Sequence, residues 1–229
     1  MSPLRILIAD DHEVVRKGIR SILEAHPGWT VCGEAADGRK AVEAARDLRP
    51  DLVVVDIGMP FLNGLDATRQ IIKARPEAKV LVLTMHESEE VVQQVLEAGA
   101  RGYLVKSDAS RDLVEAVEAL QRNKTYFTSK VAKLVLDTFL HKRSPNSGRQ
   151  MLTPREREVV QLLAEGKSSK EVAVALDLSV KTAETHRSNV MRKLDIHSVS
   201  ELVLYAVRNN IVQVVSPAVG LVVPRQDQN

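Results

Sequence analysis

The sequence predicts an α/β protein, a doubly wound parallel sheet of five strands, followed by a second, smaller domain built only from helices. Two observations support this prediction. From residue 4 to about residue 123, short apolar runs typical of buried strands alternate with segments of helical periodicity. After residue 150 the strand signal stops, and helix-start signals follow one another closely.

The first part contains five strand-helix pairs. The expected strands cover residues 4–10, 30–35, 51–56, 79–84 and 102–106. The expected helices cover residues 13–25, 38–48, 65–74, 89–98 and 113–121. A continuous apolar run such as Leu52 to Val55 is typical of a strand buried on both faces, as in a parallel sheet covered by helices. Such alternation predicts a doubly wound sheet.

The second part follows another helical pattern at residues 129–140 and a linker, "HKRSPNSGRQ", rich in turn-forming residues. Three capping-box pairs then start helices: Thr153 with Glu156, Ser168 with Glu171, and Ser198 with Glu201. Ser179 can cap a fourth helix, residues 180–194. The expected division is a sheet domain at 1–127, a linker helix and flexible linker at 128–150, a helical domain at 151–212 and a tail at 213–229.

Composition sets limits on location and partners. The chain has 229 residues and a formal charge of +2, and residues after Arg143 carry 11 basic against 9 acidic side chains. Six bases and three acids between Lys167 and Lys193 favour a polyanionic partner. A single cysteine, Cys32, excludes an internal disulfide and a cysteine-rich zinc site. Without a leader pattern or a long apolar run, we expect a cytoplasmic protein with no membrane partner.

Polar side chains follow the ends of four expected strands. Asp10 and Asp11 follow the first strand, Asp56 ends the third, Thr84 ends the fourth and Lys106 follows the fifth. Because the carboxyl ends of parallel strands meet at one edge of a sheet, these side chains are expected to share a crevice. Each residue alone has an ordinary explanation, such as a helix cap or a turn. Together they indicate a functional site.

Three clustered carboxylates repel one another unless a cation lies among them. A hard divalent ion such as Mg²⁺ suits oxygen ligands of this kind. The lysine and the threonine hydroxyl then offer a cation and a hydrogen-bond donor to an anion such as a phosphoryl group.

The motifs "IADDH", "VVVDIGMP", "VLT" and "GYLVK" make residues 4–122 resemble the receiver domain of two-component response regulators, which has a flavodoxin-like fold. The resemblance implies that Asp56 accepts a phosphoryl group from a histidine kinase. It implies that Asp10, Asp11, Asp56 and the backbone carbonyl of Gly58 hold Mg²⁺. By the same resemblance Lys106 pairs with the phosphoryl group, Thr84 donates to it, and Tyr103 is the switch aromatic that follows Thr84.

The helical part has the layout of a helix-turn-helix. A short capped helix, "SSKEVAVAL", precedes residues 180–194, whose polar side chains fall on one face at offsets of 0, 3, 4, 7 and 11. That face consists of Lys181, Glu184, Thr185, Ser188 and Arg192. A face of this kind is either a solvated surface or a surface that enters the major groove of DNA.

The segments "LTPREREVVQLLAEGKSSKEVA" and "SVKTAETHRSNVMRKL" resemble the LuxR-type DNA-binding domain of NarL/FixJ-type regulators. By that resemblance Glu184, Thr185 and Ser188 face the bases, and the candidates for backbone contact are Lys181, Thr182, His186, Arg187 and Lys193, with Arg192 on the same exposed face. The last helix, residues 198–208, has more apolar residues than one face requires, which suggests a homodimer contact through Val199, Val203 and Ala206.

The resulting interpretation is a non-enzymatic, phosphorylation-controlled transcription regulator that binds promoter DNA, whose receiver accepts a phosphoryl group and can also lose it by autodephosphorylation. Three alternatives stay open. An aspartate-nucleophile phosphatase also forms an aspartyl phosphate, but it usually needs a second acid where this chain has Gly58. In a regulator that no longer needs phosphorylation, the helix-turn-helix would still bind DNA but the aspartate site would not control it. In an adaptor that binds only protein, the basic helix face would have no binding function.

Overall fold

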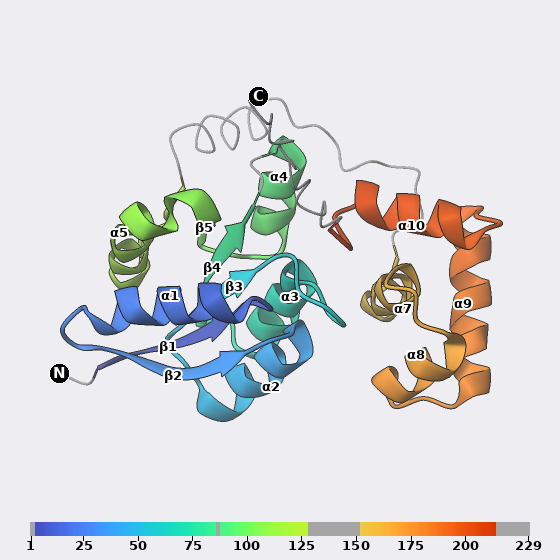
Figure 1. Cartoon of the computed structure of the whole chain (residues 1–229), viewed down its shortest axis with the longest axis horizontal. Helices are drawn as coiled ribbons and strands as arrows, with labels where there is room; N and C mark the ends of the chain where they lie inside the picture. Colours follow the sequence, from blue (N-terminus) through green and yellow to red (C-terminus); the bar gives the residue numbers. More distant parts are fainter. Residues whose placement is uncertain (1–2, 86–87, 128–151, 214–229) are drawn as a thin grey trace, which may run out of the picture.

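The computed structural model describes residues 3–85, 88–127 and 152–213, which form two domains lying side by side (Figure 1). The first is built on a five-stranded parallel sheet with the order β2-β1-β3-β4-β5. Its strands are β1 (Leu4–Ala9), β2 (Trp29–Ala35), β3 (Leu52–Asp56), β4 (Lys79–Thr84) and β5 (Gly102–Val105). The predicted doubly wound sheet is confirmed. The strand order places β1 beside β3, where the direction of winding reverses.

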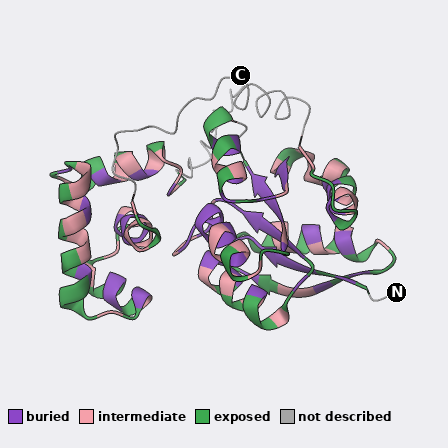
Figure 2. Ribbon diagram, turned by 180° about the vertical axis from the view of Figure 1, so that it is seen from behind, coloured by how far each residue is buried: buried purple, intermediate pink, exposed green. Residues whose placement is uncertain are grey.

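Helices cover both faces of this sheet. On one face lie α1 (Glu13–Glu24) and α5 (Ala109–Gln121), and on the other lie α2 (Gly38–Leu48), α3 (Gly64–Ala74) and α4 (Glu89–Glu97). All five residues of β3 are buried, as the continuous apolar run predicts for a central strand. Two apolar clusters result, one on each side of the sheet, and the buried residues concentrate along the strands (Figure 2).

The fifth helix begins earlier than predicted. A short 3₁₀ turn, η1 (Lys106–Asp108), leads directly into α5 at Ala109, four residues before the expected start at Leu113. The intervening residues Ser110, Arg111 and Asp112 are polar, so the first turn of α5 carries no apolar periodicity from which to recognise it. The turn matters because it fixes Lys106 at the carboxyl edge of the sheet.

The second domain consists of α7 (Pro154–Ala164), α8 (Ser169–Leu176), α9 (Val180–Leu194) and α10 (Val199–Arg208) around its own apolar core. The capping boxes at Thr153 and Ser168 are both complete, and Gly166 follows α7 with φ +83°. The predicted box at Ser198 is only half right. Ser198 caps the Glu201 amide, but the Glu201 carboxylate accepts from the His197 N–H instead of closing the box.

The predicted linker helix and linker, residues 128–150, lie outside the described residues, as does the predicted tail apart from Gln213. Among the residues with described structure, no helix is both long enough and apolar enough to cross a membrane.

Gly64 illustrates how the fold positions the site. It is the first residue of α3, and a Cβ added there would lie 1.9 Å from the backbone oxygen of Asp56. Such a contact forces the backbone to shift, at a cost of about 1–3 kcal/mol. Gly64→Ala is therefore expected to lower the free energy of unfolding by that amount, measured by urea denaturation. Gly18→Ala, at an open position in α1, is the control and should not destabilise the protein.

Candidate functional site

The candidate site lies at the carboxyl edge of the sheet, where β1, β3 and β5 end. Lys106 Nζ lies 2.7 Å from Asp10 Oδ2 and 3.0 Å from Asp56 Oδ1, so one ammonium group bridges two buried carboxylates. The side chains of Asp10 and Asp56 are 0% and 2% exposed. Asp10 is further held by the His12 N–H, which donates to its Oδ1 over 2.8 Å. The chain thus assembles from three strand ends the cluster that the sequence predicts.

The negative charge of this cluster is not fully compensated. Burial raises the pKa of Asp56 to about 6, and the nearby carboxylates of Asp10 and Asp11 add to that increase, whereas Lys106 works against it. Burial alone would lower the pKa of Lys106, but Asp56 and Asp10 raise it overall. The site therefore favours one more positive charge.

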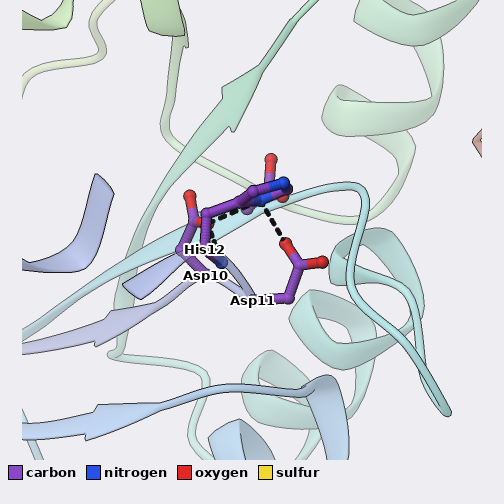
Figure 3. Close-up of side chains that lie close together, drawn as sticks. Asp10, Asp11 and His12 are labelled. Carbon is purple, nitrogen blue, oxygen red and sulfur yellow. Dashed lines mark hydrogen bonds and ion pairs between the residues drawn. The ribbon is translucent and has the colours of Figure 1, made fainter. Parts of the chain in front are cut away.

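A metal ion could supply that charge. Ligand atoms from Asp10, Asp11, His12 and Asp56 all lie within 4.8 Å of one another. Figure 3 shows His12 beside the two aspartates, with its Nδ1 2.7 Å from Asp11 Oδ1. Three carboxylates match the oxygen preference of Mg²⁺, whereas an imidazole nitrogen does not. The residues present therefore fit a hard divalent cation held by the aspartates. The sequence prediction had left His12 out, although it directly follows the aspartate pair.

Thr84 and Tyr103 lie close to this edge. Thr84 ends β4 and is buried, and it lies opposite Val105, the residue before Lys106. Tyr103 lies in β5 opposite Val82 and is fully buried in the apolar cluster beneath α4. Gly58 follows Asp56 by two residues, and a Cβ placed on it would lie 3.5 Å from Asp56 Oδ2. Asp10, Asp11, Asp56 and Lys106 therefore meet at this edge. Thr84 ends the neighbouring strand, whereas Tyr103 lies within β5 in the apolar cluster.

A second candidate site is the outer face of α9. Lys181, Glu184, Thr185, Ser188 and Arg192 are all exposed, while Ala183 and Val190 are buried on the opposite side. Thr185 donates its hydroxyl to the Lys181 carbonyl over 2.8 Å. Because the Thr185 hydroxyl is bonded within the helix, its methyl group is the part of the side chain that remains available to contact a partner. Of the other predicted DNA-contacting residues, Thr182 is exposed, and His186 and Arg187 are half-buried.

Two predictions for the second domain need qualification. Lys193 forms an ion pair with Glu156, with Nζ 2.7 Å from Oε2. A carboxylate of the same domain therefore partly neutralises its charge. Ala206 was wrongly placed on the dimer surface. It is 0% exposed and packs in the core of the second domain, because α10 turns this face toward α7. Of the remaining α10 residues, Val199 is 45% and Leu204 55% exposed, and Val203 is half-buried.

Comparison with known proteins identifies the chain. Residues 6–118 match the response regulator receiver domain, and residues 150–206 match the luxR family of bacterial regulatory proteins. The transcriptional regulatory protein LiaR of Bacillus subtilis (strain 168) is 38% identical over 209 residues, covering 91% of this chain and 99% of LiaR. The chain is a response regulator of the NarL/FixJ type.

Two further relatives agree with this assignment. The response regulator protein VraR of Staphylococcus aureus (strain Mu3 / ATCC 700698) is 36% identical, and the match covers 92% of this response regulator and 99% of VraR. A solved structure of RcsB from Salmonella enterica serovar Typhimurium, bound to promoter rprA in the presence of phosphomimetic BeF₃⁻, is 29% identical with a TM-score of 0.56. That match covers 89% of this response regulator and 98% of the RcsB chain. The resemblance of both domains to their families is thereby confirmed.

Proposed function

We propose that this response regulator accepts a phosphoryl group on Asp56 from a histidine kinase and, in response, binds promoter DNA as a homodimer to regulate transcription. The observation that carries this proposal is the Asp10–Lys106–Asp56 arrangement. It combines a buried acceptor carboxylate, a cation beside it and room for a metal among the aspartates. The LuxR-type domain supplies the output.

In the transfer step an oxygen of Asp56 attacks the phosphorus of the donor, and the bond from phosphorus to the donor histidine nitrogen breaks. The product is an aspartyl phosphate and a free imidazole. Lys106 lies 3.0 Å from Asp56 Oδ1, where its ammonium group can pair with the new phosphoryl oxygens. The Thr84 hydroxyl, at the same edge, donates to those oxygens, and Tyr103 follows the movement of Thr84. Later attack of water on the phosphorus breaks its bond to the Asp56 oxygen, which releases inorganic phosphate and returns the free carboxylate.

Asp10, Asp11, Asp56 and the Gly58 carbonyl would hold Mg²⁺ at this site. When bound, the ion supplies positive charge to the oxygens of the transferred group.

On DNA, we propose that α9 enters the major groove with Glu184, Thr185 and Ser188 toward the bases. Exposure of the whole face supports this assignment. Glu184 can accept from the amino group of cytosine, and the Thr185 methyl can contact a thymine methyl. Backbone phosphates would be contacted by Lys181, Thr182, His186, Arg187, Arg192 and Lys193. For the homodimer we propose the exposed side of α10, with Val199, Val203 and Leu204 in place of the buried Ala206.

The test is selection from a randomised duplex pool by the purified full-length protein with Mg²⁺, with and without beryllofluoride as the phosphoryl mimic. Wild type is expected to enrich one sequence more strongly with the mimic, and Asp56→Asn is expected to show no response to it. Glu184→Gln should retain overall affinity but relax the preference at one base pair, which is expected to cost about 1–3 kcal/mol of discrimination. Equal selection by wild type and Asp56→Asn under both conditions would remove Asp56 as the switch. No selection at all would favour the adaptor alternative.

A further inference from the structure

The loop between β3 and α3, residues 57–63, is held by the DNA-binding domain. Gln161 of α7 is 1% exposed, and its side-chain amide forms hydrogen bonds with two backbone groups of this loop. Its Nε2 donates to the Met59 carbonyl over 3.0 Å, and its Oε1 accepts from the Asn63 N–H over 2.7 Å. Asn63 Nδ2 also donates to the carbonyl of Ile211, just beyond α10, over 3.3 Å. The loop that follows the acceptor strand is therefore paired with the other domain.

Charged and aromatic contacts fix the same arrangement. Arg157 Nε lies 3.0 Å from Asp66 Oδ1, and Gln70 donates to Glu158 over 3.0 Å, so side chains of α7 bind side chains of α3. The Phe61 N–H donates to Glu165 over 3.1 Å, and the Phe61 ring packs against the core of the DNA-binding domain. Hydrogen bonds on both sides of the loop leave it little freedom to shift while the domains are docked.

One exposed side chain just beyond the DNA-binding domain lies near the acceptor site: that of Gln213, the first residue of the predicted tail. Gly58 has no side chain, and Gln213 fills the space beside it. A Cβ built on Gly58 would lie 2.6 Å from Gln213 Oε1 and 3.0 Å from its Cδ, with Asp56 Oδ2 at 3.5 Å. Gln213 Oε1 and Asp56 Oδ2 therefore both lie near the same point beside Gly58, although 157 positions separate Gln213 and Asp56 in the sequence.

Docking leaves the DNA-reading face open. The five residues of the exposed α9 face remain exposed with the two domains in contact. In Figure 1, α7 faces the sheet domain and α9 lies on the far side of α7. Contact between the domains therefore acts at the acceptor site and not by covering α9.

We propose that docking of the DNA-binding domain slows phosphoryl transfer to Asp56: Gln213, just beyond that domain, lies beside Gly58 near the acceptor, and Gln161 holds the adjoining loop. This inference rests on the proposed function of Asp56. Because both events use one loop, docking opposes phosphorylation and phosphorylation opposes docking to the same extent, as linkage requires of two coupled equilibria. Residues 211–213, at the end of the DNA-binding domain and the start of the tail, are thus a control element of the receiver.

The test uses the full-length protein with Mg²⁺ and acetyl phosphate, an acyl phosphate small enough to need no kinase contact. An Asp56 oxygen attacks its phosphorus, the bond from phosphorus to the acetate oxygen breaks, and acetate leaves. Initial rates are measured by intact-protein mass spectrometry. Gln213→Ala is expected to raise the rate about three- to tenfold, because a larger fraction of the protein is competent to react. Gln161→Glu removes the donor to Met59 and should act in the same direction.

Gln93→Ala is the matched control. Gln93 is an exposed glutamine of α4 whose amide donates to Glu97 of the same helix over 2.8 Å, and its replacement should leave the rate unchanged. Failure of wild type to become phosphorylated, or equal labelling of Asp56→Asn, would refute the proposed function. If wild type is phosphorylated on Asp56, the comparison with Gln213→Ala tests the inference separately. A faster rate in the variant supports the inference, and an equal or slower rate overturns it.

Discussion

Replacing Lys106 by methionine is expected to destabilise the receiver domain by about 3–5 kcal/mol at pH 7.5, because it removes the cation from a buried ionic group. Asp10 and Asp56 lie 2.7 and 3.0 Å from the Lys106 ammonium and are almost inaccessible to solvent. Methionine keeps most of the side-chain volume, so the loss reports charge and not a cavity. Urea denaturation monitored by circular dichroism measures the free energy of unfolding.

The destabilisation caused by Lys106→Met is expected to increase with pH. Burial raises the pKa of Asp56 to about 6 even with Lys106 present, so the variant should keep that pKa at least as high. A carboxyl whose pKa is higher in the folded state stabilises the fold at low pH and loses that contribution as the pH rises. The destabilisation should therefore be small at pH 5 and large at pH 8. Lys17→Met, at an exposed helix position, is the control and should show no such dependence. An equal loss at both pH values would contradict the electrostatic explanation.

Asp56→Asn is expected to change stability in the opposite direction. The pKa of Asp56 is raised from 3.8 to about 6, first by burial and then by Asp10 and Asp11, with Lys106 offsetting part of the shift. At 1.36 kcal/mol per pKa unit, ionising this carboxyl at pH 7.5 costs the native state about 3 kcal/mol. An asparagine has no such cost. We therefore expect the variant to unfold about 5–10 °C higher at pH 7.5 in the absence of divalent cations.

Two conditions should remove this gain. The stability contribution of the Asp56 carboxyl is complete below pH 3.8 and is lost as the pH rises through about 6, so wild type and variant should converge in acid. If the aspartates hold Mg²⁺ as proposed, the ion is expected to bind the wild type better than the variant, so adding it should narrow the difference at pH 7.5. Asp47→Asn, at an exposed position beside Arg46, is the control. A gain that neither acid nor Mg²⁺ reduces would show that charge burial is not its cause.

Local sequence patterns predict the helices and strands of this protein and the positions where its strands end. Apolar runs locate β1, β3, β4 and β5 within a residue or two, because burial on both faces of a parallel sheet requires them. Local hydrogen bonds explain the helix starts at Thr153, Ser168 and Ser179, where the capping side chain and the helix lie within three residues of each other. The carboxyl-edge site follows from the same logic, since each of its residues directly ends or follows a strand.

The contacts between segments far apart in the sequence follow from the three-dimensional packing and from no local pattern. Periodicity put apolar residues on α10 but could not tell which side faces the core, and so Ala206 was misplaced. Glutamines such as Gln161 and Gln213 are ordinary surface residues by composition, and no local pattern distinguishes one that reaches another domain. Their hydrogen bonds and contacts join residues about 100 or more positions apart. Such contacts depend on the docking of two folded surfaces, so the sequence predicts the aspartate cluster while the structure alone shows which residues of the second part lie beside it.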